Sequence, residues 1–417
     1  MQTTIGRRVS VSLISSATLL FTAACGGGSV DSATAGITDD TVVIGTSGPV
    51  TGDYAVDGLY VQGMRAAIGK VNAAGGVTMA DGKARKIDLR VYDDGYDPAR
   101  TLANCRQFVE RDNGFAMVMI LGTPTGLACK EYMEDAEVPS VLHHSSSQAF
   151  SGSRKDLPWQ TGFPLSYVAE GAIVIEAIKE KLPDADIAML RYGGDAGQEY
   201  HDGVKKAIAG SPMKLVADSV YTDSDTSVSS HMATLLSKRP DALLQFTSGA
   251  PVSQAIGAVH ESGQQILDFL VSTSATVSQV EPAGAEAANG TRSVQWAKDP
   301  SDPAYAKDQA VLDFQELVTE YGTGKDLDKN LGAMVGYIGA EIFIEALGKS
   351  EPTRASLMDA LHSMKELSVP GLLPGVSITT GPEDPFLIES GRIAVYDGTS
   401  WVIEDRLYSY EGRTPIL

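Results

Sequence analysis

Hydroxyl-bearing side chains gather in three short, mostly glycine-containing segments of this chain. The segments are Ser47-Gly48-Pro49-Val50-Thr51-Gly52-Asp53-Tyr54, Gly122-Thr123-Pro124-Thr125-Gly126 and His143-His144-Ser145-Ser146-Ser147. Hydroxyls and backbone N–H groups at the start of a helix can hold an anion such as a carboxylate without a buried cation. Any one of these residues, Thr125 or Ser146 for example, is better explained as a helix cap. Three such segments together favour a binding role for at least one.

Signatures of common enzyme sites are missing from the sequence. It contains no Gly-x-Ser-x-Gly elbow, no His-Glu-x-x-His helix, no Gly-x-x-x-x-Gly-Lys-Ser/Thr loop and no Cys-x-x-Cys pair. We therefore expect a binding protein, not an enzyme, with no cofactor and no metal site. A hydrolase with a dispersed site stays open as an alternative class.

Strand-like and helix-like segments alternate along nearly the whole chain, which positions the hydroxyl-rich segments at strand ends. Each strand in this pattern is followed by a helix. The first set is 41–46, 60–73, 87–92, 98–112, 115–121, 125–136 and 138–142, and the second is 187–190, 198–209, 214–221, 227–238, 241–247, 252–262 and 269–272. This succession predicts an α/β protein with two doubly wound lobes of parallel strands. Ligands bind at the carboxyl ends of such strands, so we expect the site in the cleft between the lobes.

The amino-terminal residues predict export from the cytoplasm. Arg7 and Arg8 precede an apolar run over 9–21, and small residues lead to Cys25. This pattern predicts a lipoprotein signal peptide over 1–24, lipidation of Cys25 and a flexible tether over 25–37. The alternative is a cleaved secretory peptide with an incidental cysteine. Either way, the folded part works outside the cytoplasmic membrane.

Charge and cysteine content limit the partners. The formal net charge is −20 at pH 7, and an acidic surface repels phosphate backbones, so nucleic acid is excluded as a partner. The same charge leaves the lipid as the membrane anchor, and no segment after Cys25 is expected to cross the membrane. Cys105 and Cys129 either form a disulfide or are two separate buried thiols.

Seven segments, in this order and spacing, resemble one family. They are SGPVTGDYAVDG (47–58), GMRAAIGKVNAAGGV (63–77), YDDGYDPART (92–101), GTPTGLACKEYMEDAEVP (122–139), PWQTGFPLSYVAEG (158–171), KDPSDPAYAKD (298–308) and LLPGVSITT (372–380). Together they resemble the type I solute-binding proteins of bacterial ABC importers, the group that includes the leucine/isoleucine/valine-binding proteins. The resemblance implies two Rossmann-like lobes joined by three hinge segments, with 38–162 plus 295–369 in lobe 1 and 163–294 plus 370–417 in lobe 2.

The same resemblance implies a set of ligand-binding residues. In amino-acid-binding members, the loops matching Thr123, Thr125, His144, Ser145 and Ser146 hold the ligand carboxylate. A ring at the tip after the first strand covers the ligand, and a tyrosine in a late helix reaches the cleft; these positions match Tyr54 and Tyr337 here.

Lobe 2 departs from that pattern. Amino-acid binders place an acid after the strand near 269–272, where this chain has Thr273-Ser274-Ala275-Thr276. Without an acid beside Ser274, a buried ammonium is costly. Asp195 could take that role, although a helix N-cap is the better interpretation of it. We therefore expect an organic or aromatic acid, or a branched-chain-type amino acid, as the ligand.

The implied function is the extracytoplasmic substrate-binding component of an ABC importer. Such a protein acts as a monomer, captures a small organic solute and delivers it to permease and ATPase subunits. The alternative is a ligand-sensing lobe for a signalling partner.

Overall fold

The structure is a computed structural model that describes Gln2, residues 32–52 and residues 54–417. The predicted signal peptide, Cys25 and the start of the predicted tether lie outside the described residues. The end of that tether is folded, contrary to expectation. Residues Ser32–Thr34 form a 3-10 turn (η1), Ala35 is buried, and Ile37 bridges to Val42. The folded body therefore begins before residue 38.

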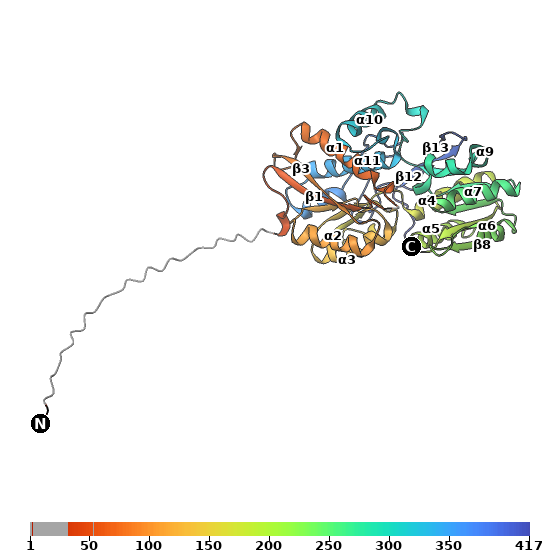
Figure 1. Cartoon of the computed structure of the whole chain (residues 1–417), viewed down its shortest axis with the longest axis horizontal. Coiled ribbons are helices and arrows are strands. Elements are labelled where there is room, and N and C mark those ends of the chain that lie inside the picture. The colour runs from red at the N-terminus through yellow and green to blue at the C-terminus, as the bar shows by residue number, and fades with distance from the viewer. Residues whose placement is uncertain (1, 3–31, 53) are drawn as a thin grey trace.

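Lobe 1 is built on a six-stranded sheet with the strand order β2-β3-β1-β4-β5-β6. All neighbouring strands are parallel except the short edge strand β2. The strands are β1 (Thr41–Gly48), β2 (Val77–Thr78), β3 (Ala84–Asp93), β4 (Ala116–Val118), β5 (Ser140–His143) and β6 (Gln160–Gly162). The helices are α1 (Tyr60–Ala73), α2 (Pro98–Glu110), α3 (Thr123–Asp135), α10 (Gln309–Tyr321), α11 (Leu331–Gly348) and α12 (Arg354–Leu361). Figure 1 shows α1, α10 and α11 on one face of this sheet and α2 and α3 on the other.

Lobe 2 has a seven-stranded sheet with the order β13-β12-β11-β10-β9-β7-β8. Its strands are β7 (Asp186–Tyr192), β8 (Lys214–Tyr221), β9 (Ala242–Phe246), β10 (Leu267–Leu270), β11 (Arg292–Gln295), β12 (Ser390–Tyr396) and β13 (Trp401–Ser409). Its helices are α4 (Tyr167–Lys181), α5 (Asp195–Ile208), α6 (Ser229–Leu236), α7 (Ala250–Ser262), α8 (Val277–Val280) and α9 (Ala285–Ala288). Strands β12 and β13 form an antiparallel hairpin that extends the otherwise parallel sheet. Together the two sheets confirm the predicted fold class.

The chain passes between the sheets three times, after β6, after β11 and before β12. The segments between the named elements include the short 3-10 turns η2 (Asp57–Leu59), η3 (Gln148–Phe150), η4 (Ser272–Ser274), η5 (Glu281–Ala283), η6 (Pro303–Tyr305) and η7 (Leu327–Lys329). The lobe boundaries at residues 162, 294 and 369 stay a prediction.

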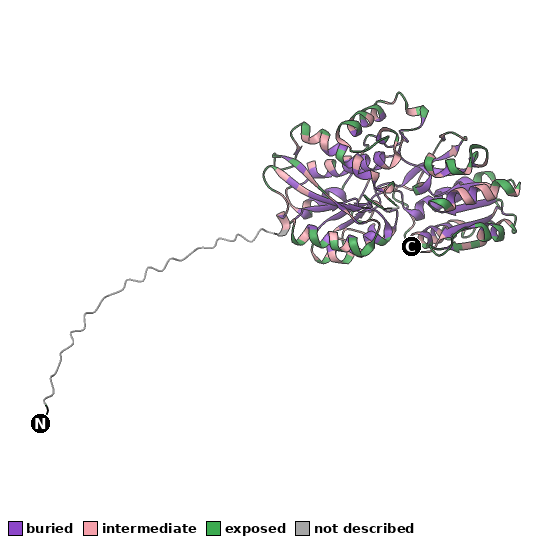
Figure 2. Ribbon diagram, in the orientation of Figure 1, coloured by how far each residue is buried: buried purple, intermediate pink, exposed green. Residues whose placement is uncertain are grey.

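The central strands are buried because both faces of each sheet are covered. Every residue of β9 is buried, as is every residue of β4 and β5. Most of these residues are apolar, which is typical of parallel strands between helices, and the buried polar ones are Ser140, His143 and Gln245. Figure 2 shows the same division, with buried strands in the interior and exposed residues on the outer faces of the helices. The carboxyl ends of the strands are therefore fixed by a rigid core in each lobe.

Helix α11 lies against α1 at unusually close range. A Cβ atom at Gly63 would lie 1.7 Å from the Ala333 carbonyl oxygen, and one at Gly336 would lie 1.8 Å from the Tyr60 carbonyl oxygen. Only glycine permits such contact between backbones. By length and composition α11 is apolar enough to cross a membrane, contrary to expectation, but 61% of that stretch is buried inside the protein. It is therefore best understood as a core helix.

The structure pairs the two remaining cysteines. Cys105 on α2 and Cys129 on α3 form a disulfide that spans 24 residues, and both side chains are fully buried. The sequence leaves open a disulfide or two separate thiols, and the structure has the disulfide. The bond joins the two helices that cover one face of the lobe 1 sheet.

Removing this bond should lower the free energy of unfolding by about 3 kcal/mol, since a cross-link over a loop of this length restricts the unfolded chain. The test is urea denaturation of Cys105→Ala/Cys129→Ala against the unmodified protein. A reducing agent should destabilise the unmodified protein and leave the variant unchanged. Identical midpoints for the unmodified protein with and without reductant would contradict the disulfide.

Candidate ligand-binding site

Three of the predicted hydroxyls meet at the start of α3. The Thr123 and Ser145 Oγ atoms lie 2.8 Å apart, and Thr123, Ser145 and Ser146 are all nearly inaccessible. They meet because β4 and β5 are parallel neighbours whose carboxyl ends lie at the same sheet edge. The Ser146 Oγ atom is buried and has no hydrogen-bond partner among the described residues. A buried hydroxyl without a partner is unfavourable, so this oxygen is available for a ligand.

Thr125 and His144 play different parts at this edge. The Thr125 hydroxyl donates to the Leu121 carbonyl and to the Gly122 carbonyl. Because the N-cap of α3 is Gly122, Thr125 is not the helix cap that the sequence suggests, and its hydroxyl bonds to its own loop. The His144 ring lies edge-on to Tyr60, with 5.1 Å between ring centroids, and its Nδ1 atom is buried without a partner in the described chain. Burial lowers the pKa of His144 to about 4. His144 therefore offers this edge a neutral imidazole, not a cation.

Tyrosines from both lobes surround the same edge. In lobe 1 the rings of Tyr54 and Tyr96 lie 4.6 Å apart, and in lobe 2 those of Tyr192 and Tyr221 lie 5.5 Å apart. Burial is the main cause of the raised pKa of Tyr96, and the phenols of Tyr54 and Tyr192 raise this pKa further. Burial likewise raises the pKa of Tyr192 to about 12, with smaller contributions from Asp223 and Tyr54. Each pair therefore carries neutral phenols at the carboxyl-terminal edge of its own sheet.

Another tyrosine begins the first helix of lobe 2. Tyr167 is buried, and its ring lies edge-on to Phe246 with 4.9 Å between centroids. Burial raises its pKa, whereas a hydrogen bond with the Thr123 side chain acts in the opposite direction. Tyr167 therefore links lobe 2 directly to Thr123 at the start of α3 in lobe 1.

Lobe 2 contributes further buried polar atoms. The Tyr200 hydroxyl and the Thr247 Oγ atom are buried and find no partner within the described ranges. Ser274 is buried in η4, the turn that follows β10. The neighbouring Ser272 donates from its backbone N and its hydroxyl to the two oxygens of Glu170, each at 2.6 Å.

Glu170 is an acid that sequence reasoning missed. The sequence offers no acid in the loop after β10 and only Asp195 as a substitute, whereas Glu170 reaches that loop from α4. Its side chain is fully buried, and burial raises the pKa of Glu170 to about 7. Both oxygens already accept hydrogen bonds from Ser272, so this carboxyl group holds a loop in place.

Two predicted site residues lie elsewhere. Tyr337 is on α11, where its ring packs against Phe314 at 5.6 Å and its hydroxyl accepts from Lys70 Nζ at 3.5 Å. These contacts place the Tyr337 side chain among α1, α10 and α11, not at the start of α3. The side of α11 that carries Tyr337 faces the helices α1 and α10. Asp195 is exposed in the first turn of α5, and the N-cap is Gly194. Asp195 is therefore not the N-cap that the sequence suggests.

The lobes are joined by hydrogen bonds near this edge. Glu199 of α5 accepts from the Ser147 hydroxyl at 2.5 Å and from the Gln148 backbone N at 2.9 Å. The Gln148 side chain in turn donates to the Pro415 carbonyl at 2.7 Å and accepts from the Leu417 backbone N at 3.2 Å. Lys206 of α5 donates to the Ile416 carbonyl at 2.5 Å. The carboxyl terminus thus lies where the two lobes meet, as Figure 1 also shows.

The buried Glu170 predicts a pH effect on stability. Because its pKa rises from 4.5 to about 7 on folding, the stabilisation is complete below pH 4.5 and is lost as the pH rises through 7. In Glu170→Gln this loss should vanish, so the unmodified protein should lose stability relative to the variant across that range. Urea denaturation between pH 4 and pH 8 measures the difference. Glu176→Gln, on the same helix beside Arg406, is the control, and parallel curves for Glu170→Gln would contradict the assignment.

Sequence and structure comparisons give one consistent result. Residues 41–399 match the family model for periplasmic binding proteins. A branched-chain amino acid ABC transporter protein from Thermus thermophilus with bound valine superposes with a TM-score of 0.77 at 17% identity, covering 89% of this chain and 97% of that one. A fatty acid ABC transporter substrate-binding protein from Thermomonospora curvata gives a TM-score of 0.72 at 21% identity, covering 92% and 97%.

A third structure agrees with these two. A possible leucine/isoleucine/valine-binding protein from Rhodopirellula baltica has a TM-score of 0.73 at 20% identity, covering 89% of this chain and 97% of that one. At these identities the similarity concerns the fold, which is that of type I periplasmic binding proteins. The family match extends over most of the sequence and over both sheets, so this chain belongs to the periplasmic binding protein family.

Proposed function

We propose that this chain is the extracytoplasmic substrate-binding component of an ABC importer. It captures one small organic solute between its lobes and presents it, as a monomer, to permease subunits. The observation that carries the proposal is a set of buried polar atoms that have no hydrogen-bond partner among the residues the structure describes. They are Ser146 Oγ, His144 Nδ1 and Thr247 Oγ after the strands, and Tyr200 Oη on α5. The similar proteins from Thermus thermophilus, with bound valine, and from Thermomonospora curvata, a fatty acid transporter component, support the same function. The protein binds its solute without altering it.

We propose that the hydrogen-bond acceptor group of the solute, such as a carboxylate, binds at the start of α3. None of the Thr123, Ser145 and Ser146 hydroxyls bonds to a lysine or arginine in the described part of the chain. A helix N-terminus supplies partial positive charge and free N–H groups, and these suit a carboxylate or another acceptor. The tyrosines of both lobes then enclose the apolar body of the solute.

The lobe 2 side argues against a free α-ammonium group. Ser274 and its neighbours carry no acid from 273 to 280, and both oxygens of Glu170 are occupied by Ser272. Asp195 is exposed at the start of α5. A buried ammonium without a carboxylate partner costs several kcal/mol. We therefore propose an organic or aromatic acid as the preferred solute.

The proposal is tested by a thermal-shift screen of residues 26–417 with amino acids, aromatic acids and fatty acids. A compound that binds should raise the melting temperature and be recovered unchanged. Small-angle scattering should then show that the same compound makes the molecule more compact, since hinged lobes close on their ligand. If L-leucine or L-valine binds below micromolar concentration while acids that lack the amino group do not, the acid proposal is wrong.

Removing a hydroxyl that contacts a charged acceptor should weaken binding tenfold to hundredfold, or about 1.5–3 kcal/mol. Ser146→Ala and Thr123→Val should each have this effect on the compound found in the screen, as measured by calorimetry. Ser237→Ala is the control, because that hydroxyl donates only to the Thr234 carbonyl on the surface. Unchanged affinity in both site variants would place the acceptor elsewhere.

The proposed lipid anchor has its own test. Cys25→Ser should move the protein from the membrane fraction to the soluble extracytoplasmic fraction, because the cysteine is the expected attachment point. Its affinity for the same compound should stay the same, since Cys25 is not among the residues proposed to contact the solute. Continued association with membranes would refute lipidation at Cys25.

A further inference from the structure

We propose that Tyr96 contacts the solute and determines specificity in this site, and that Asp94 is the positioning residue that holds Tyr96 there. This inference rests on the function proposed above. Neither residue is among those that the sequence singled out. Three independent features of the structure support it: the backbone of Tyr96, the hydrogen bonds of Asp94, and the place of the Tyr96 ring.

The backbone of Tyr96 is strained. Its φ angle is +65°, in the left-handed region that glycine and asparagine adopt readily and bulky residues avoid. In this region the Cβ atom crowds the backbone carbonyl oxygen, which is unfavourable for an L-residue with a bulky side chain. Glycine would relieve the strain, and Gly95 directly before it also has a positive φ. Such strain persists where the surroundings over-determine it, and it often marks a functional site.

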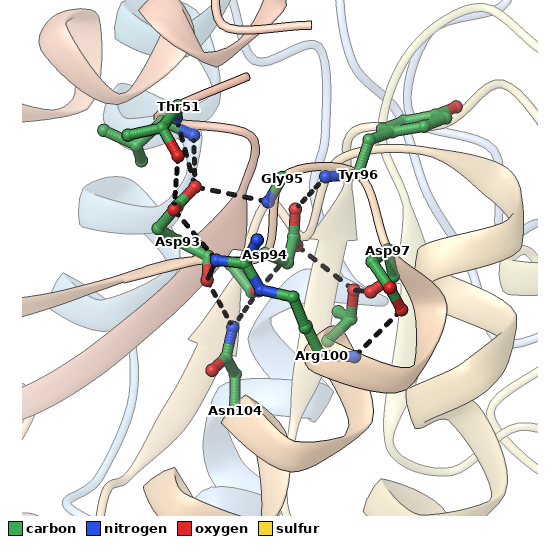
Figure 3. Close-up of polar contacts among 11 residues, drawn as sticks. Thr51, Asp93, Asp94, Gly95, Tyr96, Asp97, Arg100 and Asn104 are labelled. Carbon is green, nitrogen blue, oxygen red and sulfur yellow. Dashed lines mark hydrogen bonds and ion pairs between the residues drawn. The ribbon is translucent and has the colours of Figure 1, made fainter. Parts of the chain in front are cut away.

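Asp94 supplies the constraint. Its side chain is fully buried, and its Oδ1 atom accepts from the Tyr96 backbone N at 2.9 Å. The Oδ2 atom accepts from the Ser47 hydroxyl at 2.7 Å and the Thr101 hydroxyl at 3.2 Å. Figure 3 shows these bonds, with the Tyr96 ring directed away from the aspartates. The carboxylate therefore ties the strained residue to β1 and α2 at once.

The adjacent Asp93 fixes the partner ring. Its Oδ1 atom accepts from the backbone N atoms of Val50 and Thr51 at 3.0 and 3.1 Å, and its Oδ2 atom accepts from the Thr51 hydroxyl at 2.6 Å. Arg100 pairs with the same carboxylate at 2.9 Å. These bonds hold the segment after β1, which carries Tyr54 towards Tyr96. One pair of neighbouring acids thus sets the positions of two rings that contact each other at a tilt of 31°.

The Tyr96 ring lies directly over the start of α3. A Cβ atom at Gly122 would come within 2.6 Å of Tyr96 Cε2 and 2.9 Å of its hydroxyl oxygen. Gly122 is the N-cap that precedes Thr123. The ring therefore stands beside the proposed acceptor site, so it limits the shape of any solute held there. A flat or narrow apolar body fits against such a ring better than a branched one.

The test compares L-valine, benzoate and octanoate as probes by calorimetry. Tyr96→Ala should weaken the tightest probe at least tenfold and change the order of the three affinities, and Tyr96→Phe should keep the order. Asp94→Asn should weaken the same probe, but Asp94→Asn added to Tyr96→Ala should cost nothing more, because the carboxylate acts through the ring. Asp97→Asn is the control: Asp97 caps α2 in the same turn, so it should lower the melting temperature and leave affinity within twofold.

Additive losses in the double variant would overturn the positioning role of Asp94, and an unchanged affinity and order in Tyr96→Ala would overturn the contact role of Tyr96. If none of the three probes binds to the unmodified protein, the proposed solute class is wrong, and a measurement without ligand decides the positioning role. Nitration by tetranitromethane, located by peptide mass spectrometry, should modify Tyr96 faster in Asp94→Asn than in Asp97→Asn. Equal rates would overturn the inference.

Discussion

The geometry of the site depends on the close approach of the Tyr96 ring to the backbone of Gly122. Gly122 has a φ angle of +98°, and any side chain there would collide with the ring and with the Thr125 hydroxyl. Glycine is therefore needed at position 122 for two reasons. It adopts the positive φ of the turn that begins α3, and it leaves space for the Tyr96 ring. Through this contact the loops after β3 and β4 form one surface. The hydroxyls of Thr123 and Ser145 lie at its base, and the tyrosines stand over it.

Close contact at glycines also holds the rest of lobe 1 together. The backbones of α1 and α11 touch through Gly63 and Gly336, which brings the carboxyl-terminal part of lobe 1 onto its amino-terminal part. Because most of lobe 2 lies between α1 and α11 in the sequence, this contact closes the discontinuous lobe. Close packing of this kind tolerates little change in volume. The lobe can then move as a rigid body about its connections.

Much of the fold follows from the order of apolar segments. Alternating strands and helices predict the parallel sheets, and the family resemblance predicts two lobes. The hairpin of β12 and β13 escaped prediction, since β13 is partly exposed and carries charged residues along its length. The tether was predicted too long, because Ala35 and Gly36 look like linker residues although they contact the core.

The site was only partly predictable. Thr123, Ser145 and Ser146 could be grouped because parallel strands bring their ends to one edge. Tyr337 was misplaced because α11 is apolar on nearly all sides, so the sequence does not show which side faces the cleft. Tyr192 and Tyr221 end their strands, as the sequence could have shown, but Tyr96 depends on a backbone angle and Glu170 on a neighbouring helix. Such relations arise only from tertiary structure.

The carboxyl terminus carries a practical consequence. Its last residues form hydrogen bonds with Gln148 of lobe 1 and Lys206 of lobe 2. The end of the chain is therefore bound to both lobes at the joint between them. A purification tag or fluorescent fusion attached after Leu417 would emerge from this joint and hinder its movement. An engineered biosensor based on this protein should therefore carry its reporter at the amino-terminal side, ahead of η1, which belongs to lobe 1 and lies away from this joint.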